Sequence, residues 1–77
     1  MEMNDFIKDI ADQFDDTELS QFTPATNFRE LEEWSSLIAF AVLSIIEKKY
    51  AQINVDELRQ VNSIQELYEL VISKKIN

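Results

Sequence analysis

Two adjacent serines, Ser35 and Ser36, stand where a polar segment gives way to the most apolar run of the sequence, residues 37–46. This change in composition predicts that both serines lie at the first turn of a helix. Backbone N–H groups at that end of a helix lack intrahelical partners and the helix dipole is positive there, so a phosphate ester on a serine hydroxyl would be stabilised in place. Serine is also an ordinary capping residue, and capping chemistry alone favours that simpler role.

The residue types that the chain lacks narrow the chemistry further. It has no Cys, so it has neither a thiol nucleophile nor disulfide bonds. It has no His, which is the commonest general base and metal ligand. The carboxylates of Glu32 and Glu33 remain as candidates for catalysis, but their pattern is typical of a solvated charge run. We therefore expect no catalytic residue and no metal site, and a protein that is not an enzyme.

The charge of the chain indicates which partners suit it. Its net charge is −8, from 15 acidic and 7 basic residues. Binding to nucleic acid needs clustered Lys and Arg, and anionic membranes would repel the chain, so neither partner is expected. A basic protein surface is the natural partner, although solubility alone explains the charge equally well. The acidic residues 1–5 do not resemble a signal peptide, and the run 37–46 is too short to span a bilayer. We expect a cytoplasmic, soluble monomer without membrane insertion.

The composition and the apolar periodicity predict helices. Seventy-seven residues make a single domain over residues 1–77, and the absence of Gly disfavours the tight turns of a β-rich fold. Apolar spacing predicts helices over four ranges: 4–14, 35–50, a short one within 54–61, and 63–75. Residues 15–33, interrupted by Pro24, form a connection whose length is unusual in a compact domain and often functional. The prediction is an all-α fold, a small four-helix bundle with a long first loop and a short third helix.

Local signals set the ends of these helices. Four ends have candidate caps: Asn4, either Ser35 or Ser36, Asn54 with Glu57, and Ser63 with Glu66. Within the long loop, Phe22, Phe28 and Leu31 are expected to anchor it over the bundle by ordinary packing rather than to bind a ligand.

The order of these elements resembles the acyl carrier protein family, which includes peptidyl carrier domains. Members of that family carry an Asp-Ser-Leu motif at the start of their second helix, where this chain has Ser35-Ser36-Leu37. The serine of the motif falls on Ser36 and its leucine on Leu37. The resemblance extends over nearly the whole chain through four further segments: Thr26-Asn27-Phe28 to Leu31, Glu33-Trp34, residues 53–61, and Ser63-Ile64.

The resemblance implies a carrier function. A phosphopantetheinyl transferase would attach a 4'-phosphopantetheine arm from coenzyme A to the Ser36 hydroxyl, with Ser35 and Leu37 beside it. The arm would carry acyl groups as thioesters between acyl-transferring or condensing enzymes, for fatty acid, polyketide or related biosynthesis. Burial of each methylene group contributes about 0.8 kcal/mol, so a short acyl chain could be held weakly against the second helix. The expected acyl pocket consists of Ile38, Val42, Ile46, Tyr50 and Val61.

Two departures from the family bear on this expectation. The Asp of the motif is Ser35 here, which caps a helix equally well but supplies no carboxylate for the transferase. The acids that family members display along the second helix are absent between Ser36 and Ile46. Docking is therefore expected to use flanking acids together with apolar residues: Glu32, Glu33, Trp34, Ile38, Asp56 and Glu57.

Two alternatives remain open at this point. One is a carrier-like interaction module that is never modified and binds partners through its apolar second helix, as the substitution at Ser35 suggests. The other is an unrelated acidic helical adaptor for a basic protein. Modification at Ser36 separates the carrier from both, while the cargo and the cognate enzymes are not indicated by the sequence.

Overall fold

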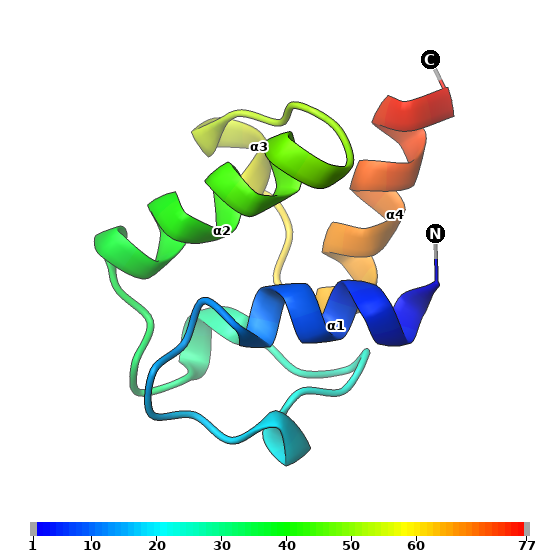
Figure 1. Cartoon of the computed structure of the whole chain (residues 1–77). Coiled ribbons are helices and arrows are strands. Elements are labelled where there is room, and N and C mark those ends of the chain that lie inside the picture. Colours follow the sequence, from blue (N-terminus) through cyan, green and yellow to red (C-terminus); the bar gives the residue numbers. More distant parts are fainter. Residues whose placement is uncertain (1, 77) are drawn as a thin grey trace.

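Four α-helices form the fold in the computed structural model, which describes residues 2–76 (Figure 1). The helices are α1 (Met3–Ala11), α2 (Ser36–Lys49), α3 (Val55–Arg59) and α4 (Ile64–Ile76). Two single turns of 3₁₀ helix, η1 (Leu19–Gln21) and η2 (Phe28–Glu30), lie in the connection between α1 and α2. The predicted all-α bundle, with its long first loop and short third helix, is confirmed.

The helices pack around one apolar core. In Figure 1, α1 and α2 cross the view in opposite directions, α4 rises beside them, and the long loop passes on the far side of α1 from α2. The largest fully buried side chains come from α1, η2, α2 and α4: Phe6, Ile10, Phe28, Val42, Ile46, Ile64, Leu67 and Val71. Burial of this apolar surface is the main favourable contribution to folding. Among the described helices, none has both the length and the apolar character that crossing a bilayer requires.

The ends of α1 differ from the prediction. The capping role predicted for Asn4 is wrong, because α1 begins one residue earlier and Glu2 precedes it without a side-chain hydrogen bond. The helix ends at Ala11 rather than at Phe14, since the N–H of Phe14 bonds to the carbonyl of Ala11 in a tighter turn. That turn still directs the Phe14 ring into the core, 5.0 Å from the ring of Phe22. The apolar spacing predicted a longer helix because Phe14 is buried even though it lies beyond the end of α1.

The caps of α3 and α4 are confirmed. At α3, the Asn54 side chain accepts the N–H of Glu57 at 2.8 Å, and the Glu57 carboxylate accepts the N–H of Asn54 at 3.1 Å. At α4, Ser63 Oγ accepts the N–H of Glu66 at 3.1 Å, and the Glu66 carboxylate accepts the N–H of Ser63 at 3.0 Å. These reciprocal bonds satisfy N–H groups that have no partner inside the helix.

The long loop is tied to the start of α4. Thr26 accepts the N–H of Ile64 at 3.1 Å, and Pro24 accepts the N–H of Gln65 at 2.8 Å. An isolated β-bridge between Asn27 and Ser63 lies beside these bonds. The predicted anchoring is also confirmed: Phe22 and Phe28 are buried, and Leu31 is half-buried against the core. No residue in the range 2–76 has a positive φ, so the loop turns without the conformation that favours Gly.

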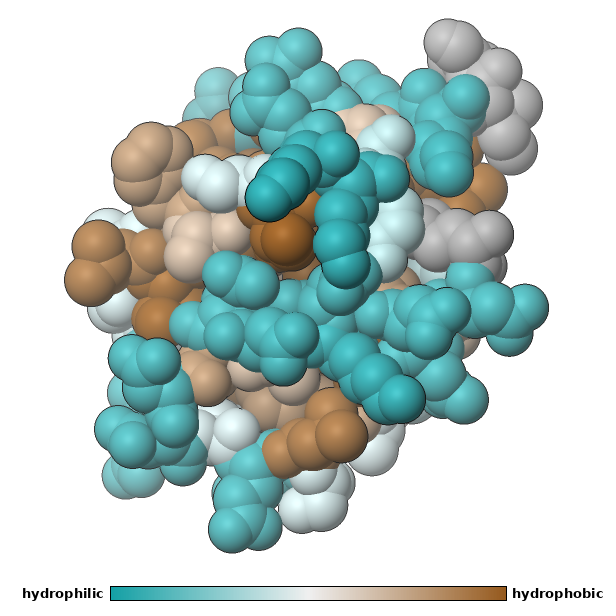
Figure 2. Space-filling model, in the orientation of Figure 1, coloured by the Kyte–Doolittle hydropathy of each residue, from teal (hydrophilic) through white to brown (hydrophobic). Residues whose placement is uncertain are grey.

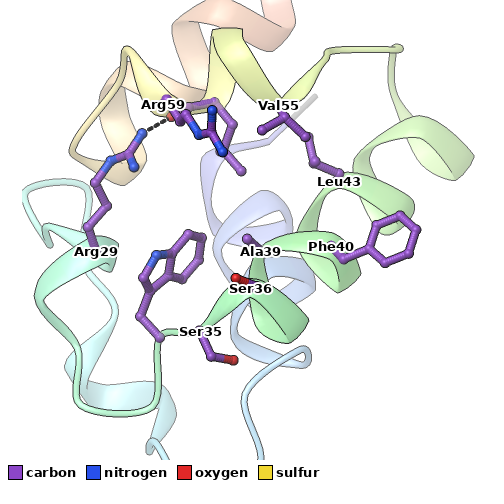
Figure 3. Close-up of a pocket in the computed structure, with 10 residues that line it drawn as sticks. Arg29, Ser35, Ser36, Ala39, Phe40, Leu43, Val55 and Arg59 are labelled. Atoms are coloured by element: carbon purple, nitrogen blue, oxygen red, sulfur yellow. Dashed lines mark hydrogen bonds between the residues drawn. The ribbon is translucent and has the colours of Figure 1, made fainter.

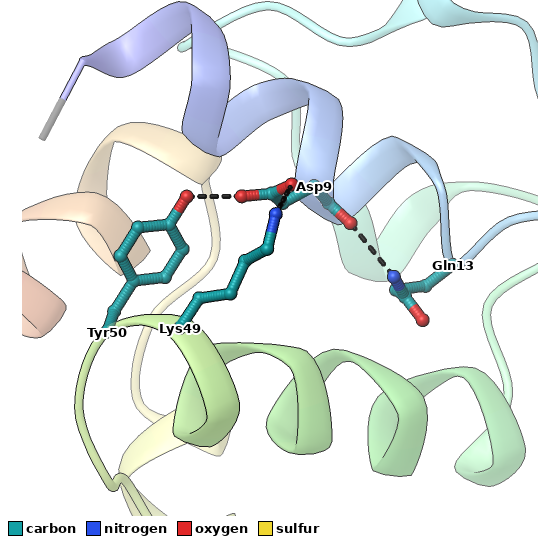
Figure 4. A network of polar contacts seen from close by, with 4 residues as sticks. All are labelled: Asp9, Gln13, Lys49 and Tyr50. Atoms are coloured by element: carbon teal, nitrogen blue, oxygen red, sulfur yellow. Dashed lines mark hydrogen bonds and ion pairs between the residues drawn. The ribbon is translucent and has the colours of Figure 1, made fainter.

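A polar network joins α1 to the end of α2 (Figure 4). The Asp9 carboxylate accepts hydrogen bonds from the Lys49 ammonium at 2.9 Å and from the Tyr50 hydroxyl. Partial burial by itself would raise the pKa of Asp9, but these two donors outweigh it and lower the pKa below its ordinary value of 3.8. The hydrogen bond to Asp9 raises the pKa of Lys49, and burial together with Asp9 raises the pKa of Tyr50. At neutral pH the network therefore contains an ionised Asp9 carboxylate, a protonated Lys49 ammonium and a neutral Tyr50 hydroxyl.

Because of this network, the free energy of unfolding is expected to decrease in acid. The pKa of Asp9 is lower in the folded than in the unfolded chain, so its contribution is present above about pH 4 and is lost as the pH falls through the folded pKa. Replacing Asp9 with Asn should cost about 1–2 kcal/mol at pH 7 and flatten the acid dependence. Urea unfolding at pH 7 and pH 3 measures both effects. Asp16→Asn, at an exposed position in the loop, is the control; an equal loss in the two variants would contradict the assignment.

Candidate functional site

Ser35 and Ser36 have different roles at the start of α2. Ser35 is the cap, since its backbone is extended and its Oγ accepts the N–H of Ile38 at 3.2 Å. Its carbonyl accepts the N–H of Ala39 at 2.9 Å. Ser36 is the first residue of the helix, its side chain is exposed, and its hydroxyl has no hydrogen bond to any residue in the range 2–76. Capping is thus completed by Ser35, and the Ser36 hydroxyl is left available.

An open hollow of about 540 Å³ lies beside Ser36, between α2 and α3 (Figure 3). Its lining consists of Arg29, Trp34, Ser35, Ser36, Ala39, Phe40, Leu43, Val55, Leu58 and Arg59. Apart from the two serines and the two arginines, every one of these side chains is apolar or aromatic. A hollow of this size and character suits a small, largely apolar group.

The wall of the hollow nearest the long loop is held by aromatic contacts and by Arg29. The Trp34 ring lies 5.1 Å from that of Phe28 and 6.3 Å from that of Phe14. Arg29 donates a hydrogen bond from Nε to the carbonyl of Val61 at 2.9 Å and a second one to the carbonyl of Leu58. These contacts connect η2 to the end of α3, so the long loop positions one wall of the hollow.

The five residues predicted to form an acyl pocket do not line this hollow. Val42 and Ile46 are fully buried in the core, and Tyr50 contacts Asp9. Ile38 and Val61 are half-buried against the core. The acyl pocket expected at these five residues is therefore distinct from this hollow and stays a prediction. The residues on the hollow are those at i+3, i+4 and i+7 from Ser36, whereas the predicted stripe on α2 started from Ile38 and faces another side of the helix.

The residues predicted for partner docking differ in their exposure and in their contacts. Two of the acids, Glu32 and Asp56, are exposed. Glu57 instead completes the cap of α3 and forms an ion pair with Lys74. The Lys74 ammonium, followed by the N–H of Asn54, lowers the pKa of Glu57. Of the two apolar residues in the set, Trp34 is a wall of the hollow and Ile38 packs against the core, both half-buried.

Glu33 holds the long loop at both of its ends. Its carboxylate accepts the N–H of Asp16 at 2.9 Å, the hydroxyl of Thr17 at 2.8 Å, and the N–H of Asp15. Desolvation alone would raise the pKa of Glu33, but these donors outweigh it and lower the pKa. Glu33 was predicted to dock partners, and its hydrogen bonds fix the chain immediately before Trp34 and the two serines.

Apolar side chains are exposed around the hollow. Leu37 is 78% exposed, Phe40 68% and Val55 47%. In Figure 2, brown side chains gather at one edge of the molecule, over the amino-terminal part of α2 as placed in Figure 1. Such exposure is unusual for large apolar residues and is typical of a binding surface. Phe40, Leu43 and Val55 were not among the predicted site residues. Counting helical positions from Ser36 would have found the first two.

Neither metal chemistry nor known relatives identify the site. No group of three potential ligands in residues 2–76 is placed to hold a metal ion. The sequence matches no family model, no curated protein and no solved structure. Function is therefore inferred from the site itself.

Proposed function

We propose that this protein carries acyl groups on a phosphopantetheine arm attached to the Ser36 hydroxyl. One observation carries the proposal: an exposed serine, not needed as a cap, opens the first turn of α2 at the edge of an apolar hollow. A helix that needed only capping would be complete with Ser35. A second serine at the hollow is accounted for if its hydroxyl is an attachment point.

The residues around Ser36 fit such an arm. The N–H groups of the first helical residues, Ser36 and Leu37, have no partners one turn earlier in the helix and would hold the phosphate. Ala39, Phe40 and Leu43 offer apolar surface beyond it. When bound, the arm supplies a terminal thiol that carries an acyl group as a thioester, a sulfur that this Cys-free chain lacks.

The chain's own residues would hold the cargo rather than react with it. Phe40, Leu43, Val55 and Leu58 can each shield methylene groups, and every methylene buried contributes about 0.8 kcal/mol. Because the hollow is open to solvent, only part of the cargo surface would be covered, which permits release. The lining contains no carboxylate, imidazole or thiol that could act as a general acid or base. We accordingly propose that the protein is not an enzyme and that its partners perform the chemistry.

The surface around the hollow would receive those partners. A phosphopantetheinyl transferase and acyl-transferring or condensing enzymes must reach Ser36, and Leu37, Phe40 and Val55 are exposed beside it. Glu32 and Asp56 are exposed, close in sequence to Trp34 and Val55 of the lining, and provide negative charge for a basic partner. We further propose a cytoplasmic location and a monomeric state, both of which rest on the sequence.

A second candidate function is an unmodified interaction module of the same fold. Ser35 in place of the family's Asp favours it, because the carboxylate expected beside the attachment serine is missing. The exposure of Leu37 and Phe40 is equally consistent with a surface that only binds proteins.

Intact mass spectrometry separates these two functions. After incubation with coenzyme A and a broad-specificity phosphopantetheinyl transferase, the protein is expected to gain the mass of one phosphopantetheine. Ser36→Ala should lose the gain completely, while Ser35→Ala should retain it and lose about 1 kcal/mol of stability with its cap. No gain in a correctly folded protein, with a cognate transferase tested as well, would support the interaction module.

A further inference from the structure

The charges that line the hollow are opposite in sign to the charge of the chain. The sequence has 15 acidic residues and only two arginines, and its net charge is −8. Both arginines, Arg29 and Arg59, line the hollow, whereas none of the acids does. An acidic protein that places its arginines in a single apolar hollow creates a local site for an anion.

The two arginines are not equally available. Arg29 is fixed by its bonds to the carbonyls of Val61 and Leu58. Within residues 2–76, Arg59 has one contact to an acid, a 3.7 Å pair with Asp56 in which both side chains are largely exposed. An exposed pair of this kind contributes little to stability, so the guanidinium of Arg59 can exchange it for another anion. In Figure 3 the Arg59 side chain lies between α3 and the residues of α2 that line the hollow.

We infer that the group carried on Ser36 presents an anionic oxygen group to Arg59, while its apolar part contacts Phe40, Leu43 and Val55. This inference rests on the proposed function and names the chemistry that Arg59 recognises in the carried group. Such oxygens have two sources: a phosphate next to Ser36, or a carboxylate at the far end of the acyl group. A guanidinium binds either with two parallel hydrogen bonds.

A chemical attachment at position 36 tests the inference without any transferase. Because the chain has no Cys, Ser36→Cys creates a unique thiol that can be alkylated to a stable thioether. Three adducts of matched length are compared: one ends in a carboxylate, one ends in a carboxamide, and one has a phosphate near the sulfur with a carboxamide end. With only two arginines, the guanidinium Nε–H region of the NMR spectrum contains two signals. The signal of Arg29 is an internal control, because its Nε–H already bonds to Val61.

The expected result is a shift of the Arg59 signal, but not of the Arg29 signal, in an adduct that carries an anion. The thermal midpoint should rise relative to the carboxamide adduct by about 2–4 °C. Both effects should disappear with Arg59→Gln and persist with Lys48→Gln, which removes an exposed charge from the other end of α2. A response to the terminal carboxylate supports an acidic cargo, and a response to the phosphate alone assigns Arg59 to the arm. No response to either anion, or a response that survives Arg59→Gln, would overturn the inference, whatever the transferase experiment shows.

Discussion

Under the proposed function, Ser35→Asp is expected to increase the rate of phosphopantetheine attachment to Ser36 by about tenfold or more. The substitution introduces the carboxylate that stands beside the attachment serine in the acyl carrier protein family, which this chain resembles. One charge-assisted interaction in the complex with the transferase contributes about 1.5–3 kcal/mol, and about 1.4 kcal/mol corresponds to a factor of ten in rate. The cap should survive, because Asp accepts the N–H of Ile38 as well as Ser35 does now. The measurement is kcat/KM for attachment, followed by intact mass.

Ser35→Asn is the matched control for this experiment. Asn caps a helix as well as Asp but has no charge, so it should leave the rate near that of the natural sequence. If Asn accelerated attachment as much as Asp, the effect would lie in the cap rather than in the carboxylate. An unchanged rate in both variants would show that the transferase does not use a carboxylate at this position, and the departure at Ser35 would then be irrelevant to modification.

Phe6→Ala is expected to remove most of the stability of the fold. The Phe6 ring is completely buried and lies 5.6 Å from the ring of Tyr50 and 5.5 Å from that of Tyr68, so it connects α1 with the end of α2 and with α4. Truncation of a buried Phe costs about 3–5 kcal/mol. A domain of this length has about 4–12 kcal/mol in total, so the variant should be largely unfolded or close to it. Urea unfolding followed by circular dichroism measures the loss.

Phe40→Ala makes the same chemical change at a position that is 68% exposed. It should change the free energy of unfolding by less than about 0.5 kcal/mol, because little packing is removed. In the proposed function it should instead weaken partner docking or cargo retention, since Phe40 lines the hollow. A large loss of stability in Phe40→Ala, comparable to that of Phe6→Ala, would show that the exposed face of α2 is part of the core.

The fold was largely predictable from the sequence, because its signals are local. Apolar periodicity predicted the four helices, and the pairs Asn54 with Glu57 and Ser63 with Glu66 predicted two of their starts. The cap predicted at Asn4 was wrong, because α1 begins without a side-chain cap and the residue type alone does not determine where such a helix begins. The hydrogen bonds of the Glu33 carboxylate were not predicted, because their donors lie up to 18 residues away and no local pattern indicates such contacts.

The site was predictable only in part. The position of Ser36 and the cap at Ser35 follow from a polar-to-apolar boundary, which is a local feature. The side of α2 that faces the hollow could not be predicted, because a helix that is apolar nearly all round does not indicate which of its faces packs against the core. That ambiguity explains why the hollow, which Ala39, Phe40 and Leu43 line on α2, was not predicted, whereas Val42 and Ile46 lie in the core. No local sequence pattern indicated that Arg59 belongs to the site, since only the tertiary fold brings it to the same hollow as Ser36.

The attachment of the long loop to α4 has a consequence for the order of events during folding. The hydrogen bonds from Ile64 and Gln65 to Thr26 and Pro24 join distant parts of the chain, whereas the helices contain only local contacts. Closing so long a segment costs entropy before any contact is gained, so these bonds should form after the transition state. Substitutions at the junction should therefore accelerate unfolding while leaving the folding rate nearly unchanged. One wall of the hollow would then be completed last, and the site beside Ser36 would be the final part of the molecule to mature.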